Sequence, residues 1–182
     1  DPALVGTSLH MAAAVLDETA VRACLAADPA QVDVPGGRRS WMPLLYLCAS
    51  RIRRHDAATR LTMARHLVEH GAPATGREPG FGSTHGTMLS PHHELFAVEA
   101  AAGGSASPEL VAFLLDAGAA LEDTTVALLQ AVRGGNLAVL DLLLERLPAA
   151  LRWQVGWALR AAIATDRLDM AHGVEVRLPF LD

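Results

Sequence analysis

The clearest pattern of apolar and polar positions lies at residues 134–147, where a glycine pair precedes a strongly apolar run. This segment reads Gly-Gly-Asn-Leu-Ala-Val-Leu-Asp-Leu-Leu-Leu-Glu-Arg-Leu. Such a pattern predicts a turn that leads into a single apolar helix. The rest of the chain can be laid out as weaker copies of this turn and helix. The pattern therefore predicts an all-α protein built from repeats.

The other apolar segments predict a series of short helices. In residues 17–27, apolar side chains recur at the i, i+3, i+4 spacing of one helix face. Pro43 suits the first turn of a helix, and Gly71 and Gly118 suit helix ends, where glycine takes the left-handed cap. Residues 73–90 are polar and irregular, which predicts an enlarged loop. The expected helices cover about residues 17–27, 57–69, 95–102, 108–116, 124–133 and 153–164, with further helices opening near residues 7 and 43.

A motif at residues 7–12 marks the start of the first copy. It reads Thr-Ser-Leu-His-Met-Ala, and the corresponding positions Ser8 and Pro43 are 35 residues apart. The motif resembles the Thr-Pro-Leu-His-x-Ala signature of ankyrin repeats, whose period is about 33 residues. In this motif the threonine can cap the helix, and His10 can bond the backbone of the turn below. The resemblance covers about residues 4–170 and implies an ankyrin-repeat solenoid of four to five helix-turn-helix repeats with protruding hairpin loops.

Two further segments extend this resemblance. Residues 32–39 read Val-Asp-Val-Pro-Gly-Gly-Arg-Arg, and Pro-Gly-Gly predicts a tight reversal at a protruding hairpin. Residues 43–51 resemble a variant found in bacterial ankyrin proteins of unassigned function. The chain departs from the ankyrin consensus at Met42, which replaces threonine, in the long loop and in a missing last helix.

The final residues follow another pattern. Residues 166–182 read Asp-Arg-Leu-Asp-Met-Ala-His-Gly-Val-Glu-Val-Arg-Leu-Pro-Phe-Leu-Asp. They resemble a motif of asparagine synthetase-like, ATP-dependent amide-forming enzymes, in which the glutamate matching Glu175 lies in the synthetase active site. The Ser-Gly-Gly-x-Asp-Ser pyrophosphate loop of that family is missing from the sequence, so no glycine-rich cradle for ATP is seen. We expect a repeat domain over 1–165 and a non-repeat tail over 166–182.

The composition supports a helical protein in a reducing compartment. The 182 residues are 51% hydrophobic but only 4% aromatic, and alanine and leucine suit close packing between helices. Cys24 and Cys48 both have apolar neighbours and form no disulfide framework, and no secretory signal is visible. We therefore expect a cytoplasmic location.

The charge and hydropathy argue against two classes of partner. The formal net charge is −5 and the pI is about 5.9, which supplies no long-range attraction for a phosphate backbone. The apolar stretches are interrupted by charge well short of the roughly 20 residues that a membrane span needs. The sequence therefore predicts neither nucleic-acid binding nor membrane insertion.

The groups that could perform catalysis or bind metal have simpler structural roles. Residues 92–94, His-His-Glu, point in different directions on a helix start, and His66 and His70 lack a third ligand. Cys48 lies on an apolar helix face, which predicts a buried thiol. The carboxylates at residues 17–18 stand at a helix start, where they can cap free amides. We expect no catalytic residue, no metal site, no cofactor and no enzymatic activity.

The exposed loops carry the residue types that anchor protein interfaces. Arginine and aromatic side chains gather on the predicted hairpin and on the enlarged loop. The turn at residues 51–55 is also basic; it is either a solvated loop or a site for an acidic protein partner. We expect Trp41→Ala and Arg39→Ala to weaken partner capture without a change in helix content. The expected partner-binding residues are Arg38, Arg39, Trp41, Tyr46, Arg77, Phe81, His85 and His92.

The sequence thus predicts a non-catalytic protein–protein interaction module. It is expected to bind another protein through its hairpin loops and a concave face formed by the first helix of each repeat. The alternative is a subunit or truncated remnant of an asparagine synthetase-like amide-forming enzyme, on the basis of residues 166–182.

Overall fold

The computed structural model of the chain is helical throughout its regular structure, apart from one isolated antiparallel bridge between Gly36 and Trp41, within the residues that it describes. This confirms the predicted all-α class. None of the described helices is long and apolar enough to cross a membrane. The described residues are 8–52, 57–75, 96–105, 107–119, 124–147 and 155–164.

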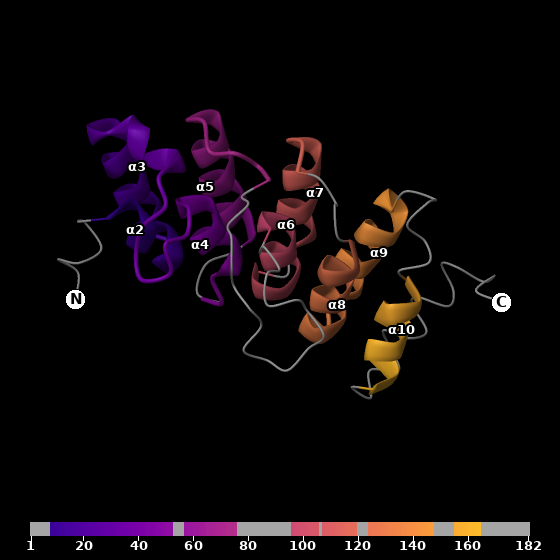
Figure 1. The fold of residues 1–182 in the computed structure, drawn as a ribbon. Coiled ribbons are helices and arrows are strands. Elements are labelled where there is room, and N and C mark those ends of the chain that lie inside the picture. Colours follow the sequence, from indigo (N-terminus) through magenta and orange to yellow (C-terminus); the bar gives the residue numbers. More distant parts are fainter. Residues whose placement is uncertain are drawn as a thin grey trace.

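The helices lie in two rows that run along the chain (Figure 1). The first row contains α2 (Leu9–Val15), α4 (Pro43–Ala49), α6 (Ala97–Ala100), α8 (Thr124–Gly134) and α10 (Val155–Ala164). The second row contains α3 (Glu18–Ala27), α5 (Ala57–Glu69), α7 (Pro108–Asp116) and α9 (Leu137–Arg146). Each helix packs against the next helix of its own row, and α2–α3, α4–α5, α6–α7 and α8–α9 also pack as pairs. The chain thus forms helix pairs placed side by side.

Two short elements complete the described chain, η1 (Pro29–Asp33) and η2 (Ala101–Ser105). The helix expected over about residues 95–102 extends further, because α6 continues directly into η2, a turn of π-helix. Glycine permits this continuation to approach α8 closely, since a Cβ on Gly103 would lie 2.9 Å from Gln130 Oε1. Most other predicted helix boundaries lie within two residues of the observed ones.

Side chains placed just before the helices satisfy the free amides of their first turns. Asp17 accepts the Ala20 N–H at 2.9 Å, as the acidic pair at residues 17–18 predicts. Asn136 accepts the Val139 N–H at 3.1 Å at the start of α9. Each such cap contributes about 1 kcal/mol to stability. The local sequence therefore sets where these helices begin.

Glycines in the left-handed conformation end two helices of the second row, as predicted. Gly71 has a φ of 105° and Gly118 a φ of 95°. The N–H of the following alanine in each case reaches back to a leucine carbonyl of the last helical turn, at 3.0 Å after Gly71 and 2.9 Å after Gly118. This pattern satisfies carbonyl groups at the helix end and closes the helix.

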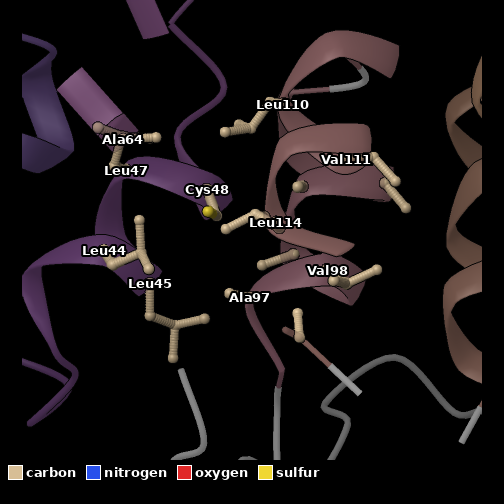
Figure 2. Close-up of a cluster of buried hydrophobic side chains, with 14 of the residues drawn as sticks. Leu44, Leu45, Leu47, Cys48, Ala64, Ala97, Val98, Leu110, Val111 and Leu114 are labelled. Atoms are coloured by element: carbon tan, nitrogen blue, oxygen red, sulfur yellow. The ribbon is translucent and has the colours of Figure 1, made fainter. Parts of the chain in front are cut away.

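Leucine and alanine side chains form most of the buried core. Figure 2 shows side chains of α4 and α5 pointing towards those of α6 and α7, where the second and third helix pairs meet. Leu44, Leu47, Leu110 and Leu114 have no exposed surface there. Burying each leucine stabilises the fold by roughly 2 kcal/mol. This core joins the second helix pair to the third.

Several predicted features fall outside the described residues. They are residues 76–90 of the enlarged loop, the tail at 166–182 and the threonine of the opening motif. The division into a repeat domain and a tail stays a prediction.

Candidate functional site

Residues 36–41 form a hairpin that leads from η1 towards α4. The Gly36 N–H donates to the Trp41 carbonyl oxygen at 3.0 Å, and the Ser40 N–H donates to the Gly37 carbonyl oxygen at 3.3 Å. Gly37 and Ser40 have φ values of 67° and 52°, in the left-handed region. The tight reversal predicted from Pro-Gly-Gly is therefore confirmed at these residues.

The hydroxyl group of Tyr46, on α4, holds this hairpin closed. It accepts the Arg39 backbone N–H at 2.8 Å and donates to the Gly36 carbonyl oxygen at 3.1 Å. A Cβ on Gly37 would lie 2.7 Å from Tyr46 Oη, so glycine is needed for this approach. Each bond contributes roughly 0.5–1.5 kcal/mol. Tyr46, predicted to contact a partner, is thus a support for the hairpin.

His10, on α2, holds the base of the hairpin. Its Nε2–H donates to the Val34 carbonyl oxygen at 2.8 Å, and the Ser8 hydroxyl lies 3.3 Å from Nδ1. Because a carbonyl can only accept, Nε2 carries the proton. A Cβ on Gly36 would lie 2.6 Å from His10 Cε1, so glycine is again required. The backbone bond predicted for His10 is confirmed, and it ties α2 to the next helix pair.

Trp41 packs inside the hairpin, which corrects the prediction that it projects from a poorly packed loop. Its side chain is 8% exposed, and its ring centroid lies 5.3 Å from that of Tyr46. Arg39 Cζ lies 4.7 Å from the centre of the Trp41 ring, a cation–π contact. Trp41→Ala would therefore remove packing as well as any contact with a partner. It does not isolate binding from stability.

The surface of this region combines positive charge with apolar side chains. Arg38 and Arg39 are exposed at the hairpin. Met11 and Val34 are 46% and 47% exposed. The Val34 carbonyl oxygen accepts the hydrogen bond from His10, and Met11 is the residue that follows His10 in the chain. Both residues are therefore close in sequence to the groups that form this bond. The sequence did not predict that these two side chains are exposed, because an exposed apolar residue next to buried ones cannot be recognised from its residue type.

Charge is distributed unequally between the two rows. In the described helices of the first row, the exposed charged side chains are Arg133 and Arg160, whereas Glu99 is buried. In the second row, arginines neutralise part of the negative charge, as in the Arg22–Glu18 and Arg146–Asp116 ion pairs. The acidic side chains of the second row are Glu18, Glu69, Glu109, Asp116, Asp141 and Glu145.

The structure brings half of the predicted partner-binding residues together. Arg38, Arg39, Trp41 and Tyr46 form one hairpin and its support. Arg77, Phe81, His85 and His92 lie outside the described residues, as do Arg53, Arg54 and His55 of the basic turn.

The buried side chains of α4 and α5 serve structure rather than catalysis. Cys48 is fully buried, and this burial raises the pKa of its thiol to about 12, while the Arg60 charge acts in the opposite direction. The thiolate needed for nucleophilic attack is therefore absent near neutral pH. Burial also lowers the pKa of Arg60, which donates to the carbonyl oxygens of Ser50, at 2.9 Å, and Ile52. Arg60 thus fixes the chain just after α4, a role that sequence reasoning missed.

His66 and His70 lie side by side on α5, with ring centroids 4.3 Å apart. His70 Nδ1–H donates to the His66 carbonyl oxygen at 2.8 Å. Partial burial, followed by the nearby His70 and Arg22, lowers the pKa of His66. No group of three or more potential metal ligands occurs among the described residues. The two rings contact each other on α5, and Arg22 of α3 is close enough to influence His66.

Neither a scan against protein-family models nor a search of the curated proteins finds a match to this chain.

Proposed function

We propose that the chain is an ankyrin-repeat module that binds another protein through its hairpin and first-row face, without catalysis. Three observations support this proposal: helix pairs in series, left-handed glycines that end second-row helices, and the bond from His10 to the turn below. Pairs that contact only their neighbours build an extended surface rather than an enclosed pocket. Such a surface suits recognition of a macromolecule.

The observation that carries the proposal is the double support of the hairpin. The Tyr46 hydroxyl bonds both sides of the turn, and His10 bonds its base. A loop that is already ordered loses little conformational entropy when it binds, so more of the contact energy appears as affinity. Exposed loops held on a rigid scaffold are where binding residues usually lie.

The proposed compartment is the cytoplasm. Cys24 and Cys48 are both free thiols, Cys48 fully buried and Cys24 partly so. The residues that resemble amide-forming enzymes, 166–182, lie outside the described chain. We therefore propose no second function.

Affinity capture from the native lysate, followed by mass spectrometry, tests the proposed binding. The variant Arg38→Ala with Arg39→Ala removes both exposed cations of the hairpin and leaves its backbone bonds in place. The control Arg22→Ala removes an exposed cation from the second row. We expect a protein that wild type and the control retain and the double variant loses, with equal circular dichroism for all three. If all three chains capture the same proteins, the hairpin is not the binding site.

An ATP–pyrophosphate exchange assay tests the non-catalytic part of the proposal. The full chain is expected to give no exchange above the rate of a heat-denatured sample. Exchange that rises with the concentration of folded chain would contradict it.

A further inference from the structure

The two arginines of the hairpin are held differently. The backbone of Arg39 is fixed by its bond to Tyr46, and its guanidinium group lies over the Trp41 ring. Arg38 is the preceding residue and is exposed. The hairpin therefore presents neighbouring positive charges on a backbone that is already ordered. Guanidinium groups in such a setting pair well with carboxylates, because their geometry allows two parallel hydrogen bonds.

Two exposed apolar residues flank the His10–Val34 bond at the base of this hairpin. Met11 and Val34 lie within one residue of the His10–Val34 bond at the base of the hairpin, and each exposes nearly half of its surface. A charged partner alone would leave these side chains in water. A partner that also carries an apolar side chain would gain roughly 25 cal/mol for each Å² of apolar surface removed from water.

Two acidic residues closely precede the hairpin in the described chain. Asp28 accepts the Ala30 N–H and a side-chain bond from Gln31, so it is engaged in the start of η1. Asp33 is exposed beside Val34 and is the nearest acid in sequence to the two arginines. Asp28 and Asp33 lie ten and five residues before Arg38, whereas the two arginines are adjacent, on a chain whose net charge is −5.

We propose that this surface, formed by Arg38, Arg39, Val34 and Met11, recognises an acidic segment of a partner protein that carries an apolar side chain beside its carboxylates. The inference rests on the proposed function and adds the chemistry of the partner. A short acidic segment matches a local positive site. A nucleic acid presents a long polyanion, which the overall negative charge of the chain repels.

Peptide selection on the full chain tests this chemistry without a known partner. A displayed library of random short peptides is selected on the immobilised chain, and the enriched peptides are synthesised with a fluorescein label. We expect enrichment of Asp and Glu next to Leu, Ile, Val or Phe. Fluorescence anisotropy then gives the Kd for wild type, Arg38→Glu and the control Arg22→Glu, which makes the same charge change on the second row.

Charge reversal at Arg38 is expected to raise the Kd roughly tenfold at low salt, whereas Arg22→Glu leaves it within about twofold. Raising the salt from about 50 mM to about 300 mM is expected to weaken wild-type binding and to leave Arg38→Glu little changed. Equal Kd values for Arg38→Glu and Arg22→Glu would overturn the inference. Competition by a single-stranded RNA homopolymer would overturn it as well.

Other outcomes separate this inference from the proposed function. The selection could instead enrich peptides that lack acidic residues and bind Tyr46→Phe more weakly than wild type. This result would overturn the inference of an acidic partner but would support binding by the hairpin. Failure to enrich any peptide, together with failure to capture any protein, would overturn both. Self-association in sedimentation experiments that Arg38→Glu abolishes would assign the surface to a second copy of the chain, and would also overturn the inference.

Discussion

At the scale of single residues, Cys48 shows how packing decides reactivity. Its thiol has no exposed surface, and burial raises its pKa to about 12. Cys24 is partly exposed on α3. We predict that a maleimide reagent modifies Cys24 in the folded protein and Cys48 only after unfolding in urea. Mass spectrometry of digested samples measures this, and modification of both thiols at one rate under native conditions would contradict the buried position of Cys48.

Two glycines allow a matched test of backbone conformation. A Cβ on Gly118 or on Gly156 would contact nothing within 4 Å, but only Gly118 has a positive φ, of 95°. Gly118→Ala is expected to destabilise the fold by about 1–2 kcal/mol, because alanine avoids this conformation. Gly156→Ala, inside α10, is expected to stabilise by about 0.5–1 kcal/mol through helix propensity. Urea unfolding measures both, and changes of the same sign would contradict this interpretation.

His66 predicts a dependence of stability on pH. Partial burial and the nearby His70 and Arg22 lower its pKa in the folded chain. Between the lowered pKa and the ordinary value near 6.5, the unfolded chain binds more protons, so stability rises with pH through this window. Stability is therefore lost as the pH falls below about 6.5.

The comparison of wild type with His66→Gln isolates this effect from the other histidines. Thermal unfolding at pH 7.5 and pH 5.5, both chosen to bracket roughly the ordinary histidine pKa, is expected to show a larger loss for wild type than for His66→Gln. His70→Gln should give an intermediate loss, because it removes one of the causes of the shift. Equal losses for wild type and His66→Gln would contradict the lowered pKa.

At the scale of elements, local sequence predicts helices and turns better than it predicts burial. The cap at Asp17, the glycine ends at Gly71 and Gly118 and the turn at Pro-Gly-Gly depend on neighbouring residues, and all were predicted. The burial of Trp41 depends on Tyr46, which lies on the next helix. The burial of Trp41 therefore cannot be predicted from its neighbours in sequence and is seen only in the folded structure.

The hairpin tests whether Tyr46 orders the candidate site. Tyr46→Phe keeps the ring and its contacts with His10 and Trp41 but removes the two bonds to Arg39 and Gly36. We predict a loss of about 1–2 kcal/mol in stability and faster hydrogen exchange at the Arg39 amide. Exchange at the α9 amides, far along the chain, is the internal control. Unchanged exchange at Arg39 would show that the hydroxyl does not hold the hairpin.

At the scale of the whole molecule, the sequence predicted helix pairs from their period, but not how charge is shared between them. Alternation of first and second helices places Arg133 and Arg160 in one row and most exposed acids in the other. This separation appears only when helices far apart in the sequence are aligned in rows (Figure 1). Among the predicted binding residues, those of the hairpin are held by His10 of α2 and Tyr46 of α4.

The two rows predict how stability is distributed along the molecule. Each helix contacts mainly its neighbours, so α4 and α8 have a described first-row neighbour on both sides, whereas α10 has one. Opening an inner helix breaks two interfaces and opening an end helix breaks one. We predict slower hydrogen exchange in α4 and α8 than in α10. Leu45→Ala, at a fully buried site of α4, should cost roughly 2–5 kcal/mol and speed exchange in α2 and α6 as well.

Ile163→Ala provides the control for that substitution, because Ile163 lies on α10 with 58% of its surface exposed. It should change stability by no more than about 0.5 kcal/mol and leave exchange in α4 unaltered. Mass spectrometry after timed exchange in deuterated buffer follows all these helices in one sample. If every helix instead exchanges at a single rate in wild type and in Leu45→Ala, the molecule opens as one unit. The hairpin would then depend on the whole chain rather than on α2 and α4.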